Sequence, residues 1–234
     1  MIIEPVVQGA AGMIMQPPGY LVGVRQLTQK HDVLLIADEV AVGFGRTGAM
    51  FACNHENIQP DLMCLAKGLT GGYITMAATL ATTEIWNAFL GDSAHTFYHG
   101  HTYGGNPLAA AAAIANLDIF ESEQTMNNVH ARTKQLADLL KPLADHPHVG
   151  DIRQRGLIVA IELVADKNNK TPFENLGATG SAVCKAVLKE GVWLRPLRDT
   201  IVIMPPLSIS ETEITKIAAA VEYAICDTLD DYSA

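Results

Sequence analysis

The sequence has little basic charge: it carries 16 Lys and Arg against 25 Asp and Glu in 234 residues, a net charge of −9. Nucleic-acid-binding surfaces normally gather positive charge on one face, so this balance argues against a nucleic acid as partner. Long apolar runs are also missing, because Asn116 and Asp118 interrupt the most apolar segment, 108–120. A transmembrane helix needs roughly 18 such residues, so we expect no membrane segment.

Cysteine is scarce and its spacing is uninformative. The four cysteines, at positions 53, 64, 184 and 226, form no CxxC pair and no disulfide framework. No basic residue precedes Arg25, so the opening segment lacks the positive start of a signal peptide. We therefore expect a reduced, cytoplasmic protein, and a composition that is 49% hydrophobic excludes disorder.

Strand and helix patterns alternate in the first half of the chain. Apolar runs predict buried strands at 33–37 and 61–66 and a third strand at 75–81, while helical spacing appears at 21–31. Asn106 and Pro107 fit an N-cap followed by proline at the first helical position, which predicts an Ala-rich helix to about residue 120. Such alternation is typical of a parallel α/β sheet.

The pattern changes near residue 120. Helices are predicted at 125–144, 177–190 and 210–229, and strands at 157–163, 192–194 and 201–204. Ser210 and Glu213 stand in capping-box positions at the start of the last helix. We therefore expect two domains: residues 1–120 belong to a larger sheet domain, and residues 121–234 form a small α+β domain.

Two motifs suggest sites that we consider less favoured. Residues 43–48 (GFGRTG) match the GxGxxG pattern of dinucleotide-binding turns, but Asp38 and Glu39 would place negative charge beside a pyrophosphate. A flexible glycine loop is the simpler interpretation. His95, His99 and His101 lie close in sequence, yet no cysteine or acidic ligand stands between them, so we predict no metal site.

Asp38 and Lys67 form a more specific pair. Each lies at or just past the end of a predicted buried strand, and ligands gather at the C-terminal strand ends of parallel sheets. Partial desolvation would lower the pKa of the lysine and favour its free amine. A free amine beside a carboxylate suits pyridoxal phosphate, because the amine attaches the cofactor and the carboxylate keeps the pyridine nitrogen protonated. Spacing alone leaves a structural ion pair or two unrelated charges as the simpler alternative.

Four motifs in register resemble those of class III (omega-type) aminotransferases: residues 4–9 (EPVVQG), 37–48 (ADEVAVGFGRTG), 65–72 (LAKGLTGG) and 101–108 (HTYGGNPL). The resemblance covers essentially the whole chain and implies the fold-type I architecture and dependence on pyridoxal 5'-phosphate. It implies that Lys67 is the Schiff-base lysine and proton shuttle. It further implies that Asp38 pairs with the pyridine nitrogen and that Val40 packs on the ring face.

The same resemblance gives roles to further residues. Thr102, with the neighbouring His101 backbone, would hold the cofactor phosphate, usually that of the partner subunit in a homodimer. A hydroxyl in a glycine-rich turn before a helix start suits that task, because free backbone N–H groups attract phosphate. The simpler alternative for Thr102 is an ordinary turn residue. Glu4 would face the active site behind the residues that touch the cofactor, and its alternative is a surface charge at a strand end.

A narrower set of motifs resembles the branch of the family that serves biotin synthesis: residues 97–103 (FYHGHTY), 148–153 (HVGDIR) and 194–197 (LRPL). This resemblance implies transfer of an amino group to 8-amino-7-oxononanoate, with S-adenosyl-methionine or lysine as donor. Arg195 would hold the distal carboxylate of the acceptor, a task that suits a planar guanidinium. Gly100 would let the chain of the substrate approach closely.

Two alternatives remain open at this point. The chain could be another omega-aminotransferase with a different acceptor. It could also be a non-catalytic remnant, because the family's N-terminal phosphate turn and ring-stacking aromatic residue do not precede Glu4. The resemblance therefore implies that this chain is the C-terminal portion of a longer enzyme, with uncovered apolar surface and a need for an N-terminal partner.

Overall fold

The computed structural model describes residues 1–230 and divides them into two compact units. The first unit contains residues 1–6, 16–45 and 49–125, and the second contains residues 7–15, 46–48 and those from 126 onward. The second unit thus includes two short segments from the first half of the sequence. The proposed division of the chain near residue 120 stays a prediction about its domains.

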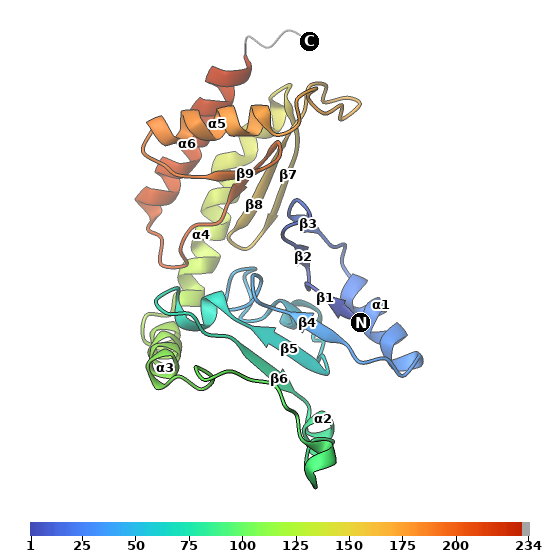
Figure 1. Ribbon diagram of the computed structural model, residues 1–234. Helices are drawn as coiled ribbons and strands as arrows, with labels where there is room; N and C mark the ends of the chain where they lie inside the picture. Colours follow the sequence, from blue (N-terminus) through green and yellow to red (C-terminus); the bar gives the residue numbers. More distant parts are fainter. Residues whose placement is uncertain (231–234) are drawn as a thin grey trace. The chain divides into compact units, whose positions relative to one another are not determined.

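A four-stranded sheet forms the centre of the first unit (Figure 1). Its strands, in spatial order, are β1 (Ile2–Ile3), β4 (Ile36–Asp38), β5 (Leu62–Leu65) and β6 (Ala78–Ala81). The pairs β1–β4 and β4–β5 are parallel, so the C-terminal ends of these strands lie at one edge. The last strand, β6, pairs with β5 in the antiparallel sense.

Two details of this sheet differ from the sequence prediction. The predicted strand 33–37 is observed only as β4, and both Val33 and Leu34 are exposed. The predicted third strand is shorter than expected. It is observed as β6, the outermost strand of the sheet, which is antiparallel to β5 and has three of its four residues exposed. Apolar sequence alone does not distinguish a strand buried on both faces from one at a sheet edge.

The helices of the first unit are α1 (Tyr20–Lys30), α2 (Thr83–Asn87) and α3 (Pro107–Ser122), with short 3-10 turns η1 (Ala52–Glu56), η2 (Lys67–Thr70) and η3 (Ser93–His95). The predicted start of α3 is confirmed, because the Asn106 side chain accepts hydrogen bonds from the N–H groups of Leu108 and Ala109 at 2.9 and 3.4 Å. Only Ala109 and Ala113 of this apolar helix are buried.

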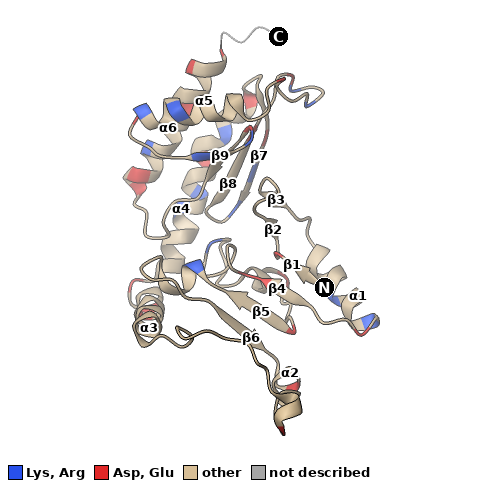
Figure 2. Ribbon diagram, in the orientation of Figure 1, with Lys and Arg blue, Asp and Glu red and all other residues tan. Residues whose placement is uncertain are grey.

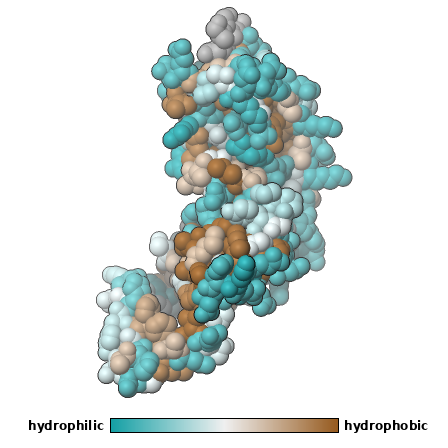
Figure 3. Space-filling model, turned by 90° about the vertical axis from the view of Figure 1, so that its right-hand side faces the viewer, coloured by the Kyte–Doolittle hydropathy of each residue, from teal (hydrophilic) through white to brown (hydrophobic). Residues whose placement is uncertain are grey.

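Large apolar side chains remain exposed on the first unit, among them Tyr73, Leu108 and Ile114. On the face drawn in Figure 3, hydrophobic side chains are visible among hydrophilic ones. A helix that is apolar on all sides is normally buried against other structure. The first unit therefore has apolar surface that suits contact with further polypeptide.

An ion pair ties α1 to the start of β5. The guanidinium of Arg25 donates to both carboxylate oxygens of Asp61, at 2.7 and 3.0 Å, and the N–H of Leu35 donates to the same carboxylate at 2.7 Å. Both charged side chains are less than one-fifth exposed. The hydrogen bond from Arg25 is the main reason that the pKa of Asp61 lies below its ordinary value.

We expect Asp61→Asn to lower the free energy of unfolding by about 1–3 kcal/mol at neutral pH, because Arg25 loses its charged partner in a half-buried position. The lowered pKa means that this carboxylate stabilises the fold above its ordinary pKa of about 3.9 and loses that effect as the pH falls through the folded-state value. Urea unfolding at pH 7 and pH 3 measures this, with the exposed Asp118→Asn as control. Equal losses of stability in both variants would contradict the prediction.

The second unit contains a four-stranded antiparallel sheet, a two-stranded ribbon and three helices (Figure 1). The sheet has the order β7 (Val149–Arg155), β8 (Ile158–Leu163), β10 (Thr200–Ile203) and β9 (Arg195–Leu197). The ribbon pairs β2 (Val7–Gln8) with β3 (Ile14–Met15). The helices are α4 (Thr125–Leu140), α5 (Ala178–Lys189) and α6 (Glu211–Leu229), and the 3-10 turn η4 (Lys141–Asp145) follows α4.

One apolar core joins α4, α5 and α6 to this sheet, and Leu136, Ile161 and Ile225 are fully buried in it. The predicted capping box of α6 is confirmed: Ser210 N–H donates to the Glu213 carboxylate at 2.8 Å, and Glu213 N–H donates to the Ser210 hydroxyl at 3.3 Å. The strand predicted at 192–194 is wrong by a few residues, since β9 begins at Arg195.

Charged residues of both signs are interspersed along the chain (Figure 2). Among the residues that the structure describes, no helix is long and apolar enough to cross a bilayer. All four cysteines are free thiols. Burial raises the pKa of Cys184 to about 11 and also raises that of Cys53, where Glu39 adds to the effect. These two thiols are therefore poor nucleophiles.

Candidate active site

Asp38 and Lys67 lie at the ends of adjacent parallel strands in the first unit. Asp38, the last residue of β4, stands opposite Cys64 of β5, and Glu39 N–H donates to the Cys64 carbonyl at 3.0 Å. Lys67 begins η2, three residues beyond Cys64. The topology thus brings both residues to the same edge of the sheet, as their sequence positions predict.

The turn that carries Lys67 has an unusual backbone. Lys67 has a φ of 45°, a left-handed conformation that is uncommon for a residue with a side chain. The next residue must be glycine, because a Cβ on Gly68 would lie 2.8 Å from Cβ of Phe44. Strained backbone of this kind often occurs at functional sites, where the surrounding structure holds it in place.

Asn116 is a residue whose role the sequence analysis missed. Its side-chain amide, on α3, donates to the carbonyl oxygens of Gly68 and Leu69 at 2.8 and 3.2 Å. These bonds fix the turn directly after Lys67. The signal in the sequence is a single amide within the apolar helix α3. An amide on such a helix commonly hydrogen-bonds to backbone groups of a neighbouring element.

The two neighbouring acids, Asp38 and Glu39, have different surroundings. Glu39 is fully buried, and its carboxylate accepts the N–H groups of Ala52 and Cys53, both at 2.8 Å. Burial raises the pKa of Glu39 despite these two bonds. Asp38 is half-buried, and among the hydrogen bonds of the described residues its carboxylate accepts only the N–H of Val40, at 3.1 Å through Oδ1. Asp38 is therefore the acid that is available to a ligand.

Lys67 itself is exposed, so the expected partial desolvation of its amine is wrong for this chain. The physical reason is that η2 lies at the open edge of the sheet, where the neighbouring residues Gly71 and Gly72 are exposed and add no side chains. Val40, predicted to pack on the cofactor ring, is half-buried two residues beyond Asp38.

The predicted phosphate-binding residues His101 and Thr102, and the predicted substrate-binding Gly100, lie in a segment without helix or strand. Gly100, His101 and Thr102 are exposed, and the His101 ring accepts the N–H of Tyr103 at 3.1 Å. No hydrogen bond of the described residues joins this segment to Asp38 or Lys67. Glu4 is half-buried, and its carbonyl accepts the side-chain amide of Gln16 at 2.8 Å. The roles of these four residues stay predictions.

Arg195 belongs to the second unit and lines a pocket there. The pocket has a volume of about 330 Å³, and its wall is formed by Met13, Trp193, Leu194, Arg195, Leu197, Val202 and Met204. Arg195 is the only charged residue of this wall. A single cation in an apolar pocket can hold a carboxylate while the apolar side chains contact a hydrocarbon chain.

The glycine motif at 43–48 is neither a dinucleotide-binding turn nor a flexible loop. Residues 42–45 are buried, and a Cβ on Gly43 would lie 2.7 Å from the Glu39 carbonyl oxygen. A series of turns follows β4, and the next regular element is the short η1 rather than a long helix. The glycines allow close packing of the backbone at this turn.

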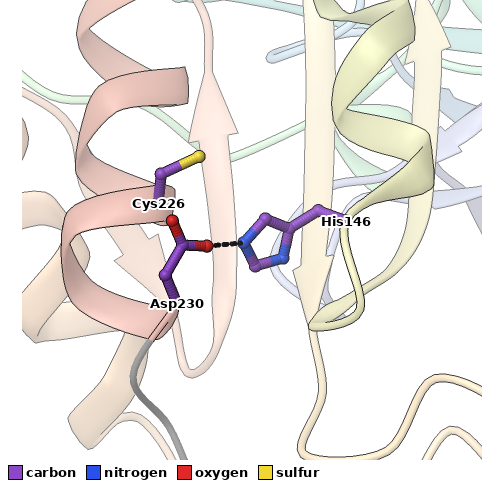
Figure 4. A group of neighbouring side chains, drawn as sticks. All are labelled: His146, Cys226 and Asp230. Carbon is purple, nitrogen blue, oxygen red and sulfur yellow. Dashed lines mark hydrogen bonds and ion pairs between the residues drawn. The ribbon is translucent and has the colours of Figure 1, made fainter.

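A cluster outside these sites contains His146, Cys226 and Asp230, whose ligand atoms lie within 4.8 Å of one another (Figure 4). His146 Nε2 lies 3.3 Å from Asp230 Oδ1, while His146 Nδ1 accepts the N–H of His148 at 3.1 Å. The proton of a neutral ring is thus on Nε2, the atom that a metal would need unprotonated. The arrangement favours a His–Asp hydrogen bond over a metal site.

The profile of the class-III aminotransferase family matches residues 1–225. The chain belongs to this family. The predicted family is therefore confirmed, and with it a relationship to enzymes that depend on pyridoxal phosphate.

Curated relatives narrow the comparison. The chain is 53% identical over 227 residues to an adenosylmethionine-8-amino-7-oxononanoate aminotransferase of Nitratidesulfovibrio vulgaris, covering 96% of this chain and 42% of that protein. It is 52% identical to the protein of the same name from Geobacter sulfurreducens, covering 96% of this chain and 50% of the other. The chain thus spans about half the length of the curated relatives that it matches.

Solved structures agree with the fold. The crystal structure of the Methanocaldococcus jannaschii protein of that name superposes with a TM-score of 0.94 at 45% identity, covering 97% of this chain and 53% of that one. The omega transaminase of Pseudomonas jessenii in complex with PMP superposes with a TM-score of 0.93 at 37% identity, and the match covers 98% of this chain and 51% of that one. The class III, fold-type I architecture predicted from sequence is confirmed.

The residues present fit the family's cofactor. The edge of the sheet carries an exposed amine on Lys67 and, one strand away, a carboxylate on Asp38 with a second oxygen, Oδ2, that accepts no hydrogen bond among the described residues. An amine can attach an aldehyde, and a carboxylate can keep a ring nitrogen protonated. This pair is the chemistry that pyridoxal phosphate requires.

Proposed function

We propose that this chain carries out, within a complete class III enzyme, the transfer of an amino group to 8-amino-7-oxononanoate, giving 7,8-diaminononanoate in biotin synthesis. The supporting observation for the substrate is the identity of 53% and 52% to two relatives named for this reaction. The placement of Asp38 and Lys67 at one sheet edge supports the chemistry.

Three residues of the first unit have proposed tasks at the cofactor ring. Lys67 would attach the cofactor and carry the proton between the two carbons of the 1,3-shift, and Asp38 would hold the proton on the ring nitrogen. Val40 packs on the ring face. When bound, pyridoxal phosphate withdraws electrons from the carbon that loses its proton. The hydrogen bond from Asn116 holds the turn after Lys67 and so fixes the backbone position from which the amine would reach the cofactor.

Further residues complete the proposed site. His101 and Thr102 hold the cofactor phosphate across the interface of a homodimer, and Glu4 supports the site from behind the residues that touch the cofactor. Arg195 binds the distal carboxylate of the acceptor, and Gly100 leaves room for its hydrocarbon chain. The amino donor is S-adenosyl-methionine or lysine, and we place the enzyme in the cytoplasm.

We also propose that residues 1–120 are the C-terminal part of the cofactor-binding large domain and that residues 121–234 form the small C-terminal domain. The chain covers only 42–50% of its two bacterial relatives, and its first unit exposes apolar side chains on α3. These observations also support an alternative, in which the chain is active only together with a complementary N-terminal polypeptide.

The proposal is tested by supplying the chain with pyridoxal phosphate, the oxo acid and either donor, and detecting 7,8-diaminononanoate by mass spectrometry. A second arm adds a polypeptide that supplies the remaining length of the Geobacter relative. We expect 7,8-diaminononanoate in the arm that contains the added polypeptide. Amino transfer to other oxo acids but not to this one would contradict the biotin assignment, and product from the chain alone would contradict the need for a partner.

A further inference from the structure

Arg153 of β7 joins two carboxylates to a turn in the second unit. Its side chain is 19% exposed, and its Nη1 contacts Glu162 and lies 3.0 Å from Asp151 Oδ2. The same guanidinium donates through Nε to the Met13 carbonyl at 3.3 Å and through Nη2 to the Gly12 carbonyl at 3.1 Å. Nη1 of the guanidinium thus faces the two carboxylates, while Nε and Nη2 donate to the carbonyl groups of the turn.

The turn that Arg153 holds is conformationally unfavourable. Gly12 has a φ of 115°, and Met13 has a φ of 53°, in the left-handed region that residues with a side chain seldom occupy. Within the turn, the N–H groups of both residues donate to the Gly9 carbonyl, at 3.1 and 2.9 Å. The two bonds from Arg153 add an anchor from outside the turn, so the direction of the Met13 side chain depends on the guanidinium.

Met13 lines the same pocket as Arg195 and Trp193. Arg153 is absent from the pocket wall and reaches it only through the backbone of Met13. We propose that Arg153 is a positioning residue that sets the Met13 wall of the Arg195 pocket and thereby its fit to an aliphatic chain ending in a carboxylate. This inference rests on the proposed function, because it assumes that Arg195 holds such a carboxylate.

Lysine is the informative replacement for Arg153. Its ammonium keeps the positive charge between Asp151 and Glu162, but it is a compact point charge and cannot donate in the fixed, divergent directions of a guanidinium. Arg153→Lys should therefore preserve the ion pairs and release the carbonyl groups of Gly12 and Met13. Arg155→Lys is the matched control, since Arg155 lies two residues further along β7 and outside the pocket wall.

Trp193 provides a readout that does not depend on catalysis. The sequence has two tryptophans, Trp86 and Trp193, so the Trp86→Phe chain reports fluorescence from the pocket alone. This chain is titrated with nonanoate, and nonan-1-ol serves as the ligand without a carboxylate. We expect Arg153→Lys to weaken nonanoate binding by about fivefold or more, the scale of one or two neutral hydrogen bonds. Arg155→Lys should leave the affinity unchanged.

A double-mutant cycle separates positioning from a general loss of structure. If Arg153 acts through Met13, then Arg153→Lys should have little further effect in a Met13→Ala chain, because the side chain that it positions is gone. Additive losses in the two variants would overturn the inference. So would an unchanged nonanoate affinity in Arg153→Lys.

Arg195→Met distinguishes failure of this inference from failure of the proposed substrate site. Loss of nonanoate binding in Arg195→Met, together with full binding in Arg153→Lys, would overturn the inference and leave the proposed function standing. Equal binding of nonanoate and nonan-1-ol, or no fluorescence change in the parent chain, would overturn both the carboxylate pocket and the inference built on it.

Discussion

Lys67→Ala should abolish covalent attachment of pyridoxal phosphate and all amino transfer. Alanine has no amine to react with the aldehyde. No other lysine belongs to the strands of this sheet or to the turns that follow them: along the sequence, the nearest lysine before Lys67 is Lys30, at the end of α1, and the nearest after it is Lys134, on α4. Treating the chain and cofactor with borohydride and mapping the modified peptide by mass spectrometry measures attachment directly. We expect the label on the peptide that contains Lys67.

Lys30→Ala is the matched control for this experiment. Lys30 is an exposed lysine in the last turn of α1, so its loss should change neither labelling nor activity. The Lys67→Ala chain should retain its fold, because the Lys67 side chain is exposed and the turn is held by Asn116 rather than by the lysine. Labelling that persists in Lys67→Ala, or that maps to another lysine, would contradict the assignment.

The position of Lys67 was predictable because it depends on chain order and strand ends. Two apolar runs about one crossover apart predict adjacent parallel strands, and the residues that follow them must then share an edge. The conformation of the lysine turn was not predictable in this way. It depends on Phe44 and Asn116, which lie far from Lys67 in the sequence and approach it only in the folded unit.

The choice between Asp38 and Glu39 shows the same limit. Both acids follow one apolar strand, and their sequence positions differ by a single residue. The structure separates them, because the Glu39 carboxylate accepts two backbone N–H groups from η1, whereas Asp38 accepts one from Val40. The family motifs indicate Asp38 as the cofactor's acid. The physical reason that Glu39 is not available is its hydrogen bonds to η1, which begins thirteen residues further on, and hydrophobic periodicity does not reveal such bonds.

The sequence patterns also did not predict that β6 is antiparallel to β5. Nor did they predict that the second unit combines segments from both halves of the chain. Strand direction depends on how the chain returns to the sheet, and the run 75–81 gives no information on this. Residues 7–15 belong to the second unit although they precede the first long helix. The Arg153 side chain donates to the carbonyl of Met13, 140 residues away in the sequence, and such long-range polar contacts leave no local pattern.

Asp38→Asn should lower amino transfer by on the order of 10²-fold or more while the chain keeps its fold. The amide oxygen of asparagine can still accept the N–H of Val40, so the single hydrogen bond of the Asp38 side chain in the described structure is retained. The negative charge is lost, and with it the group that holds a proton on the ring nitrogen of the cofactor. Removal of one preorganised electrostatic partner commonly costs a factor of this size in kcat.

The measurement for Asp38→Asn compares kcat, cofactor labelling at Lys67 and thermal unfolding in the same samples. Labelling should persist, because attachment uses the amine of Lys67 and not the carboxylate, whereas kcat should fall. Asp32→Asn is the control, since Asp32 is exposed in the same unit and its φ of 53° suits asparagine. Asp38→Glu should restore part of kcat because it restores the charge. A normal kcat in Asp38→Asn would show that the ring nitrogen has another partner, and a parallel loss of labelling and stability would assign Asp38 a structural role instead.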